Sequence, residues 1–569
     1  MNNFFRPQLI GCLRHYNART FLQDSIAGVI VGIVAIPLAI AFGIASGVGP
    51  AEGLVTAIIA GFLISVLGGT KVQIGGPTGA FIVIIYGIIQ SYGLGGLMIA
   101  TLMAGVILVL MGVFKLGGII KFVPYPIIVG FTAGIAVTIF STQMNDFFGM
   151  NIEDVPADFL GKWACYARHL GDINWTAFGV GLVSLLIIVF IPKLSKKIPA
   201  SLVAIVFVTA AVWISRRMGL MQGVTTISDL YELPRGIPKP SLPAFQLAEG
   251  QTVWGLVQEL FPSAFTIAVL GAIESLLSAM VADGVTGDSH DSNTELIAQG
   301  VANICTPFFG GIPATGAIAR TMANINNGGK TPVAGIVHTL VLLLVLLFMG
   351  DLVGMIPMAC LAAVLIMVSY NMSGWRTFLW LAKNPKSDFA VMLLTFILTV
   401  LFNLTVAIGV GLLLAVALFL KRTNEATVIR KFTGELDPRK NNDVRMNDLE
   451  MLHIPDKTEV YEIDGPYFFG IANKFDEISR SVGKNGQKVR IIRMRKVSFM
   501  DSTGIHNLEQ LYLRTRRCGV QLVLSGVNHH VYEALEKAGL VEMIGRKNIR
   551  DHINGALSRA EEIVSGKES

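Results

Sequence analysis

Long apolar segments recur through the first three quarters of this chain and constrain its fold more than any other feature. Most are long enough to cross the roughly 30 Å hydrocarbon core of a bilayer as helices. The sequence is 53% hydrophobic and only 15% charged, with a mean hydropathy of +0.61, which is unusual for a soluble protein. We therefore predict an α-helical polytopic membrane protein. About fourteen transmembrane segments can be delimited, in two sets of seven: 25–47, 52–69, 77–91, 95–113, 119–142, 175–191 and 199–215, then 258–282, 295–309, 314–327, 332–349, 352–370, 388–402 and 404–420.

Two of these segments begin at a similar interruption rich in glycine, proline and threonine. The first break is residues 75–80 (GGPTGA), and the second is residues 310–317 (GGIPATGA). The helices that follow, at 77–91 and 314–327, would cover only about 20–22 Å at 1.5 Å per residue. They are too short to span the bilayer and are expected to be half-helices.

The breaks also predict the arrangement of the two sets. We expect extended chain before each break, over 70–74 and 306–310, because β-branched and aromatic residues there precede Gly and Pro. Each break lies in the third segment of its set. An odd number of spans per set gives two repeats of opposite orientation, about 25–215 and 258–421 (7+7 inverted repeats), with a site between them at the midplane.

Loop charges predict the orientation. Lys and Arg fall mostly in alternate loops, and the positive-inside rule makes that side the cytoplasm. We expect a cytoplasmic segment at 1–24, a multi-pass transmembrane transport domain at 25–422, and cytoplasmic termini. The location would be the plasma membrane, which is the inner membrane of a bacterium. No cleavable signal peptide is expected before the first span.

Several classes of function are unsupported by the sequence. The five cysteines lie far apart, without disulfide or zinc spacing, so no metal site is expected. Nothing in the sequence resembles a nucleotide-binding loop, which argues against a primary pump. The charge of +6 reflects loop lysines and arginines, and no nucleic-acid partner is expected. We predict neither catalytic residues nor an organic cofactor, so the chain would not be an enzyme.

The composition becomes that of a soluble domain after Arg422. We assign 423–455 to a linker and 456–569 to a small α/β domain in which strands alternate with helices. Strands are expected at 458–463, 489–494 and 521–526, and helices at 472–482 and 505–518.

The turn at 499–504 (FMDSTG), between a strand and a helix, resembles the signature of STAS domains, a module shared with anti-sigma-factor antagonists. The resemblance implies that Thr503, with Ser502 beside it, is a regulatory phosphorylation site and that the domain has a cytoplasmic partner. The alternative is that Asp501, Ser502 and Thr503 cap the following helix.

Further motifs extend the resemblance over nearly the whole chain: Ala35-Ile36-Pro37-Leu38-Ala39, the first break, Val123-Pro124-Tyr125-Pro126, Asn293-Thr294-Glu295-Leu296 and Pro313-Ala314-Thr315-Gly316. With a STAS domain after a twice-broken membrane domain, the chain resembles the SulP family of anion transporters. The resemblance implies that spans one to four and eight to eleven form a core that carries the substrate. The remaining spans would form a gate and a homodimer scaffold within the membrane lipid, and the core would move like an elevator.

The breaks predict a binding site for a small inorganic anion. Each would place a helix N-terminus at membrane depth, with unpaired N–H groups and about half an elementary positive charge. Hydroxyl donors are expected from Thr78 and Thr315, and accessible backbone N–H groups from Gly79, Ala80, Gly316 and Ala317. The alternative is that these glycines only permit close packing.

Two charged residues lie inside predicted spans. Arg320 follows Gly316 by about one helical turn, so it can contact an anion at the start of that helix. Glu274 lies in the eighth segment with Ser278 one turn on, and a buried carboxyl group can exchange a coupling proton. A burial cost of about 2.5–3.5 kcal/mol makes idle charges unfavourable there. The alternatives are that Arg320 snorkels to the interface or pairs with a structural carboxylate, and that Glu274 forms a purely structural salt bridge.

The resemblance leaves coupling and substrate open. A glutamate at 274 with Arg320 is similar to proton-coupled sulfate transporters, whereas sodium–bicarbonate members have an aspartate that helps to hold Na⁺. Leu38 is similar to the bicarbonate type, and Ile318 departs from it. We expect proton-coupled sulfate symport, with sodium-coupled bicarbonate transport and a passive anion channel or exchanger as alternatives.

Overall fold

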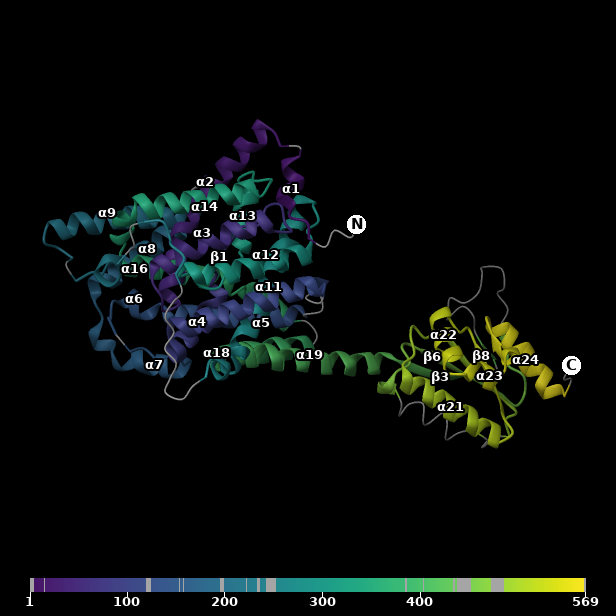
Figure 1. Ribbon diagram of the computed structural model, residues 1–569. Helices are drawn as coiled ribbons and strands as arrows, with labels where there is room; N and C mark the ends of the chain where they lie inside the picture. Colours follow the sequence, from purple (N-terminus) through teal and green to yellow (C-terminus); the bar gives the residue numbers. More distant parts are fainter. Residues whose placement is uncertain are drawn as a thin grey trace. The chain divides into compact units, whose positions relative to one another are not determined.

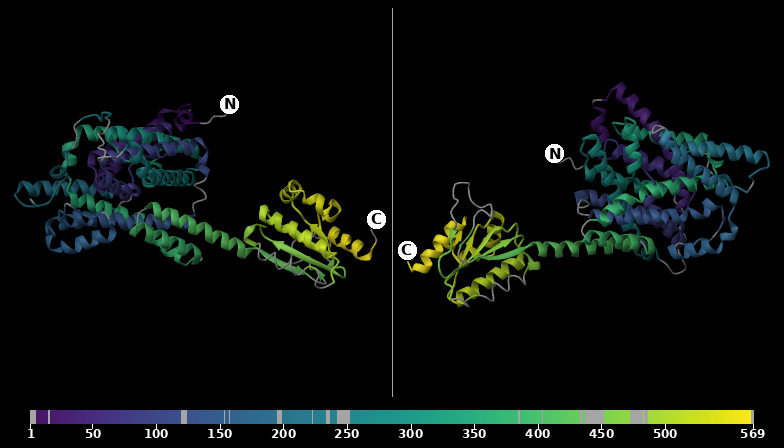
Figure 2. Two further views of the ribbon diagram at one scale, coloured as in Figure 1. Left: turned by 60° about the horizontal axis from the view of Figure 1, so that its bottom comes forward. Right: turned by 180° about the vertical axis from the view of Figure 1, so that it is seen from behind.

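The computed structural model describes two compact units, residues 1–413 and 414–569, and each is considered by itself (Figures 1 and 2). The residues it describes are 5–14, 16–118, 124–152, 154–156, 158–194, 199–221, 223–232, 236–241, 252–383, 386–402, 404–432, 435–436, 452–471, 482 and 486–566.

The first set of predicted segments contains a helix at every position, with two extended residues at the break. In chain order the elements are α1 (Gln8–Leu13), α2 (Ala18–Ala45), α3 (Pro50–Leu67), β1 (Gly75–Gly76), η1 (Gly79–Phe81), α4 (Ile82–Val113), α5 (Tyr125–Thr142), α6 (Met144–Phe148), α7 (Phe159–Arg168), η3 (Leu170–Asp172), α8 (Trp175–Leu194) and α9 (Ala200–Arg217).

The second set repeats this pattern. Its elements are α10 (Ile227–Leu230), α11 (Val253–Thr286), α12 (Ser292–Cys305), η4 (Thr306–Phe309), β2 (Thr315–Gly316), α13 (Ile318–Asn326), α14 (Val333–Phe348), α15 (Gly350–Gly354), α16 (Met358–Met372), α17 (Trp375–Ala382), α18 (Lys386–Leu401) and α19 (Leu404–Ala426), the last of which continues into the second unit.

The prediction of extended chain over 306–310 is wrong. These residues form the 3₁₀ helix η4, which continues directly from α12. Pro307 is placed in its first turn, where a fixed φ and a missing N–H are tolerated. Gly310 ends it with a φ of 80°. The extended approach to the second break therefore begins only after Gly310.

Eight helices in the described part of the chain are long and apolar enough to cross a membrane. One of them, from Gly79 to Val113, covers two predicted segments and bends at Gly93, where φ is 65°. Helix α13, after the second break, has only nine residues, as expected for a half-helix. The count of fourteen spans stays a prediction.

The helices of the first unit pack in two groups. The helices of each group contact mainly one another. The first group is α2, α3, α4, α11, α12, α13 and α14, and the second is α5, α6, α8, α9, α16 and α18. Figure 1 shows α8, α9, α16 and α6 at the left of this unit, and α2, α3, α13, α14 and α12 toward its centre and right. The first group consists of the segments that the family resemblance assigns to a core.

Glycine allows the closest contact within this first group. A Cβ added to Gly105 on α4 would lie 2.7 Å from the Gly300 carbonyl oxygen, and one added to Gly300 on α12 would lie 2.6 Å from the Gly105 oxygen. The two backbones can approach this closely only because both residues lack side chains.

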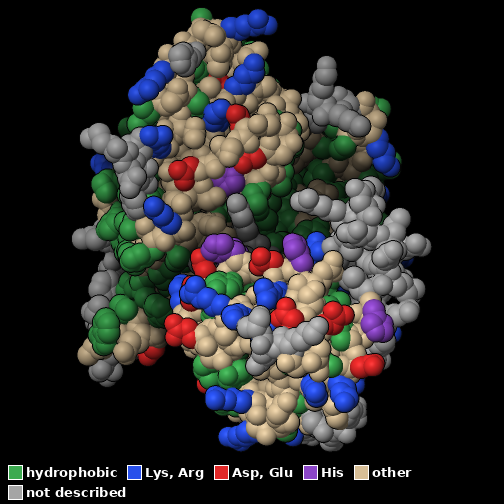
Figure 3. Space-filling view, turned by 90° about the vertical axis from the view of Figure 1, so that its right-hand side faces the viewer, with side chains coloured by type: hydrophobic (Ala, Val, Ile, Leu, Met, Phe, Trp, Pro, Cys, Tyr) green, Lys and Arg blue, Asp and Glu red, His purple; other side chains and the backbone are tan. Residues whose placement is uncertain are grey.

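Apolar side chains also cover the outside of the first unit. Seven large ones on α8 are exposed: Trp175, Leu182, Val183, Leu186, Val189, Phe190 and Leu194. Broad hydrophobic areas are visible beside charged ones in the space-filling view (Figure 3). Such a surface suits contact with lipid.

The second unit contains a five-stranded sheet in the order β3-β6-β7-β8-β9, with β3 antiparallel and the other pairs parallel. Its elements are β3 (Val428–Phe432), β4 (Glu435–Leu436), β5 (Leu452–His453), β6 (Thr458–Asp464), η6 (Phe469–Ile471), β7 (Val489–Lys496), α21 (Ser502–Arg517), β8 (Gln521–Ser525), α22 (His529–Lys537), α23 (Leu540–Ile544), η7 (Arg546–Asn548), β9 (Ile549–Arg550) and α24 (Ile553–Ser565).

Both faces of this sheet are covered by helices. Ile492 and Leu524 pack with residues of α21 and α22, whereas Ile491 and Val523 pack with α24. The three predicted strands and the predicted helix at 505–518 are confirmed. The predicted helix at 472–482 lies almost entirely outside the described residues. Strand β3 falls within the segment assigned to a linker, so the sheet begins before residue 456.

Candidate functional site

The two breaks pair with each other. Strands β1 and β2 run antiparallel, with Gly75 opposite Gly316 and Gly76 opposite Thr315. Helix η1 and then α4 follow the first strand, and α13 follows the second. Because the strands are antiparallel, the helices that follow leave the ladder in opposite directions. The predicted meeting of two helix starts is thus present.

The backbone donors at this meeting point differ partly from the prediction. The N–H of Gly316 donates to Ser275 Oγ (3.1 Å), and that of Ala317 donates to the Ile74 carbonyl (2.9 Å). The prediction that these two groups are accessible is therefore wrong, because pairing of the breaks supplies them with acceptors.

Other backbone N–H groups at the two helix starts precede the first hydrogen bond of their helix. The first hydrogen bond of η1 runs from the Phe81 N–H to the Thr78 carbonyl, so the N–H groups of Gly79 and Ala80 precede it. In α13, the Thr321 N–H donates to the Ala317 carbonyl. The N–H groups of residues 318–320 consequently have no acceptor within their own helix.

The Thr315 hydroxyl ties the second break to α11. It donates to the Gly271 carbonyl (3.1 Å) and lies 2.5 Å from Ser275 Oγ. The side chain is fully buried. Its predicted role as an open hydroxyl donor does not agree with these bonds, because the donor is already used within the protein.

The Thr78 hydroxyl ties the first break to the same helix. It donates to Glu274 Oε2 at 2.8 Å. Ser278, one turn after Glu274, instead donates to Thr321 Oγ1 on α13 at 3.2 Å. Thr78 therefore contacts the predicted coupling residue, and Ser278 joins α11 to α13.

Arg320 is the cation nearest to the paired breaks. Its side chain is 98% buried, and its Nη2 donates to the Pro77 carbonyl at 2.5 Å. Its Nη1 is buried without a hydrogen-bond partner and lies close to Gly76, where an added Cβ would be 2.5 Å from it. In the described part of the chain no carboxylate pairs with Arg320, so the predicted alternative of a structural salt bridge to Glu274 finds no support.

Glu295 is a buried carboxylate beside the site whose contacts the sequence did not indicate. It is fully buried and accepts hydrogen bonds from the Gly69 N–H, Thr70 Oγ1, Gln73 Nε2 and Gln299 Nε2, at 2.9–3.0 Å. These bonds hold the extended approach to the first break against the start of α12. The sequence marked this residue only by the motif at 293–296, at the beginning of an apolar segment, and gave no hint of its partners.

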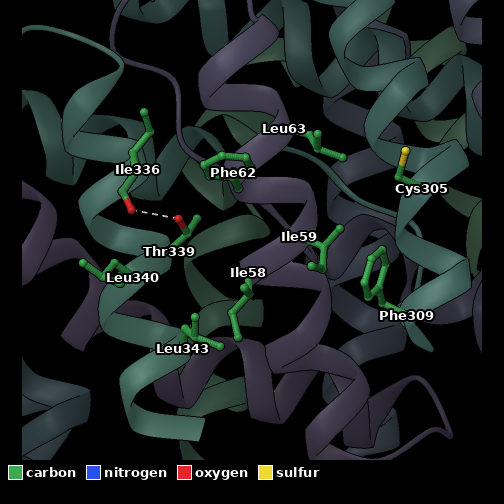
Figure 4. Close-up of a pocket in the computed structure, with 10 residues that line it drawn as sticks. All are labelled: Ile58, Ile59, Phe62, Leu63, Cys305, Phe309, Ile336, Thr339, Leu340 and Leu343. Carbon is green, nitrogen blue, oxygen red and sulfur yellow. Dashed lines mark hydrogen bonds between the residues drawn. The ribbon is translucent and has the colours of Figure 1, made fainter. Parts of the chain in front are cut away.

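The first unit also contains a groove lined by apolar side chains. It has a volume of about 480 Å³ and is lined by side chains of α3, α12, η4 and α14, all apolar except Thr339 (Figure 4). The Thr339 hydroxyl donates to the Ile336 carbonyl at 2.8 Å. The groove therefore offers no polar side-chain donor to an anion, unlike the paired breaks.

The turn of the second unit behaves as a helix cap. Asp501 Oδ1 accepts from the Gly504 N–H (2.8 Å), and its Oδ2 accepts from the Phe469 N–H (3.0 Å). Asp501 alone caps α21, since Ser502 and Thr503 are the first two residues of that helix. Ser502 is exposed. Phosphorylation at this turn stays a prediction.

Comparison with known proteins identifies the membrane domain. The model of the sulfate permease family matches residues 21–395, and that of the STAS domain matches residues 451–556. The chain belongs to the sulfate permease family. This sulfate permease family member is therefore an anion transporter with a STAS domain, and not an enzyme.

Individual relatives cover almost the whole of this family member. It is 42% identical to "Putative sulfate transporter YvdB" of Bacillus subtilis, over 95% of this chain and 98% of that one. The transmembrane domain of the cyanobacterial bicarbonate transporter BicA is similar to 70% of it, covering 98% of that chain, with 30% identity and a TM-score of 0.59. Murine Slc26a9 shares the fold, with a TM-score of 0.84 at 19% identity over 97% of this chain and 93% of that one.

Proposed function

We propose that this protein is a secondary active transporter that carries a small inorganic oxyanion, sulfate in first place, together with a proton. The observation that carries the proposal is the buried, unpaired Nη1 of Arg320. A buried cation without a carboxylate partner is costly, and an anion beside it removes that cost. Open N–H groups at the starts of η1 and α13 add partial positive charge at the same place.

Glu274 supplies the proton-binding group of this proposal. Its carboxylate accepts a hydrogen bond from Thr78 in the first break. The adjacent residue of that break, Pro77, accepts the hydrogen bond from Arg320. An anion bound near Arg320 repels a charged carboxylate and so favours its protonated form. Anion and proton would then bind together and leave together, which is symport.

The remaining parts of the proposal rest on the family and on loop charges. The two helix groups of the first unit provide a core and a gate for elevator-type alternating access. The protein would act as a homodimer in the bacterial inner membrane, with cytoplasmic termini and a cytoplasmic partner for the STAS domain. Sodium-coupled bicarbonate transport is the second candidate, favoured by Leu38 in α2 and by the similarity to BicA.

Competition for uptake separates these functions. Purified full-length protein in liposomes should take up radiolabelled sulfate without Na⁺, and unlabelled sulfate should compete better than bicarbonate, dicarboxylates or chloride. Uptake that requires Na⁺ and is blocked best by bicarbonate would favour the second candidate. If the membrane domain served only as a scaffold, Glu274→Gln and Arg320→Ala would behave like the unaltered protein.

A further inference from the structure

Helix α14 contains a buried histidine that the proposed site does not use. His338 is fully buried, and neither ring nitrogen has a hydrogen-bond partner. The Gly335 carbonyl, one turn earlier, lies near the ring. A neutral imidazole has one donor and one acceptor, so two unpaired ring nitrogens at a buried position are unfavourable and indicate a functional reason for the residue.

The position of His338 links it to the paired breaks. A Cβ added to Gly61 on α3 would lie 3.7 Å from His338 Cε1 and 3.2 Å from the Gly75 carbonyl oxygen. A Cβ added to the next residue of β1, Gly76, would lie 2.5 Å from Arg320 Nη1. The imidazole and the guanidinium thus lie beside consecutive residues of the same strand.

Through β1, Arg320 is a charged group that the described contacts link to this imidazole. A second charged group, the buried carboxylate of Asp24 on α2, accepts hydrogen bonds from Lys330 and Thr331 just before α14 begins. Helix α2 faces it with Gly28 and Gly32, and α3 faces it with Ser65, whose hydroxyl bonds within its own helix. Because both side chains lie beside β1, the charge state of His338 responds to whether the positive charge of Arg320 is compensated.

We propose that His338 is a second proton-exchanging residue of the transport cycle, coupled to the anion through Arg320. This inference rests on the proposed proton-coupled function. With the site empty, the charge of Arg320 opposes a second positive charge nearby. An anion beside Arg320 compensates that charge, and a ring nitrogen of His338 takes a proton from the side where the anion entered. When the anion leaves, repulsion by Arg320 returns the proton to water on the other side.

The consequence is a defined stoichiometry. Glu274 and His338 each carry one proton, so a divalent oxyanion such as sulfate moves with two protons and no net charge. Without a titratable group at 338, sulfate would move with one proton and one net negative charge. Membrane potential would then act on uptake, with an inside-positive potential driving it.

The test uses the full-length protein in liposomes, with sulfate accumulation measured at set proton gradients and potentials. We expect two protons per sulfate for the unaltered protein and one for His338→Gln, whose amide can hydrogen-bond but cannot take up a proton near neutral pH. Only the variant should respond to potential in the absence of a pH gradient. Thr339→Val is the matched control, because it changes the adjacent residue, which lines the apolar groove, and should leave the stoichiometry at two.

Two results would overturn the inference while leaving proton-coupled transport intact: the same stoichiometry in His338→Gln as in the unaltered protein, or one proton per sulfate in the unaltered protein. The stoichiometry of the unaltered protein decides the question even where the variant does not fold. Uptake by the unaltered protein that ignores the proton gradient altogether would contradict the proposed function as well.

Discussion

Thr78 donates its hydroxyl proton to Glu274 across 2.8 Å, which joins the first break to the middle of α11. The preceding residue, Pro77, accepts a hydrogen bond from Arg320 on α13. Two charged groups from the second half of the chain thus contact adjacent residues of the first half without pairing with each other. In the proposed mechanism, both charges can then exchange partners when an anion and a proton arrive.

Removing the carboxylate at 274 should weaken the coupling of transport to the proton gradient. Glu274→Gln keeps the size of the side chain and its bond to Thr78 but cannot release a proton. We expect the dependence of uptake on a pH gradient to fall in this variant to what the proton on His338 alone supplies, while anion binding persists. Flux measured at several external pH values checks this, with the exposed Glu232→Gln as control. An unchanged pH profile would remove Glu274 from the mechanism.

Substitution of Arg320 should weaken anion binding even when the charge is kept. Lysine cannot bond Pro77 and present a second donor in the same fixed plane. We expect Arg320→Lys to raise the KM for sulfate at least about tenfold, as for the loss of one charged hydrogen bond, and Arg320→Ala to abolish saturable uptake. The exposed Arg217→Ala serves as control. A normal KM for Arg320→Lys would contradict direct anion contact.

Glycine at position 76 is required by both its conformation and its neighbour. Its φ is 146°, and an added Cβ would lie 2.5 Å from Arg320 Nη1. We expect Gly76→Ala to reduce uptake at least about tenfold by displacing the guanidinium. Gly87→Ala, at a position with nothing within 4 Å of the new Cβ, should transport normally. Equal activity of the two variants would argue against a packed site at the break.

The STAS domain should lose stability in acid through one buried carboxylate. Burial opposes ionisation of Glu459, but hydrogen bonds from Lys431 and Arg490 outweigh it and hold the pKa of Glu459 below its usual range. Because the folded-state pKa is lowered, the stabilisation is complete above the usual glutamate pKa and is lost as the pH falls through the folded-state value.

Glu459→Gln should therefore destabilise this domain by about 3 kcal/mol at neutral pH, because Arg490 is fully buried. The difference should disappear in acid. Hydrogen exchange of β6 and β7 in the full-length protein measures both effects. Glu536→Gln, which alters an exposed ion pair with Arg546, should match the unaltered protein at every pH. A Glu459→Gln deficit that persists in acid would exclude this explanation.

The sequence predicted those parts of the site that depend on local pattern. Glycine and proline within apolar runs located both breaks, and charge within apolar segments located Glu274 and Arg320. The three STAS strands at 458–463, 489–494 and 521–526 followed from their residue pattern.

What the sequence could not predict depends on contacts between distant segments. The bond from the Gly316 N–H to Ser275, and the donors around Glu295, become visible only when α11 and α12 are placed beside the breaks. The buried position of His338 depends on the packing of α14 against α3. The error at 306–310 is local, since Pro307 suits the first turn of a helix as well as an extended chain.

Sulfate accumulation driven by a proton gradient alone tests the central claim most directly. Purified full-length protein in liposomes, with the membrane potential clamped at zero and Na⁺ absent, is given an alkaline interior and radiolabelled sulfate. We predict accumulation above the external concentration, and a smaller accumulation in Glu274→Gln, which keeps only the proton carried by His338. Sulfate that only equilibrates across the membrane, or that accumulates equally without the pH gradient, would contradict proton-coupled transport by this protein.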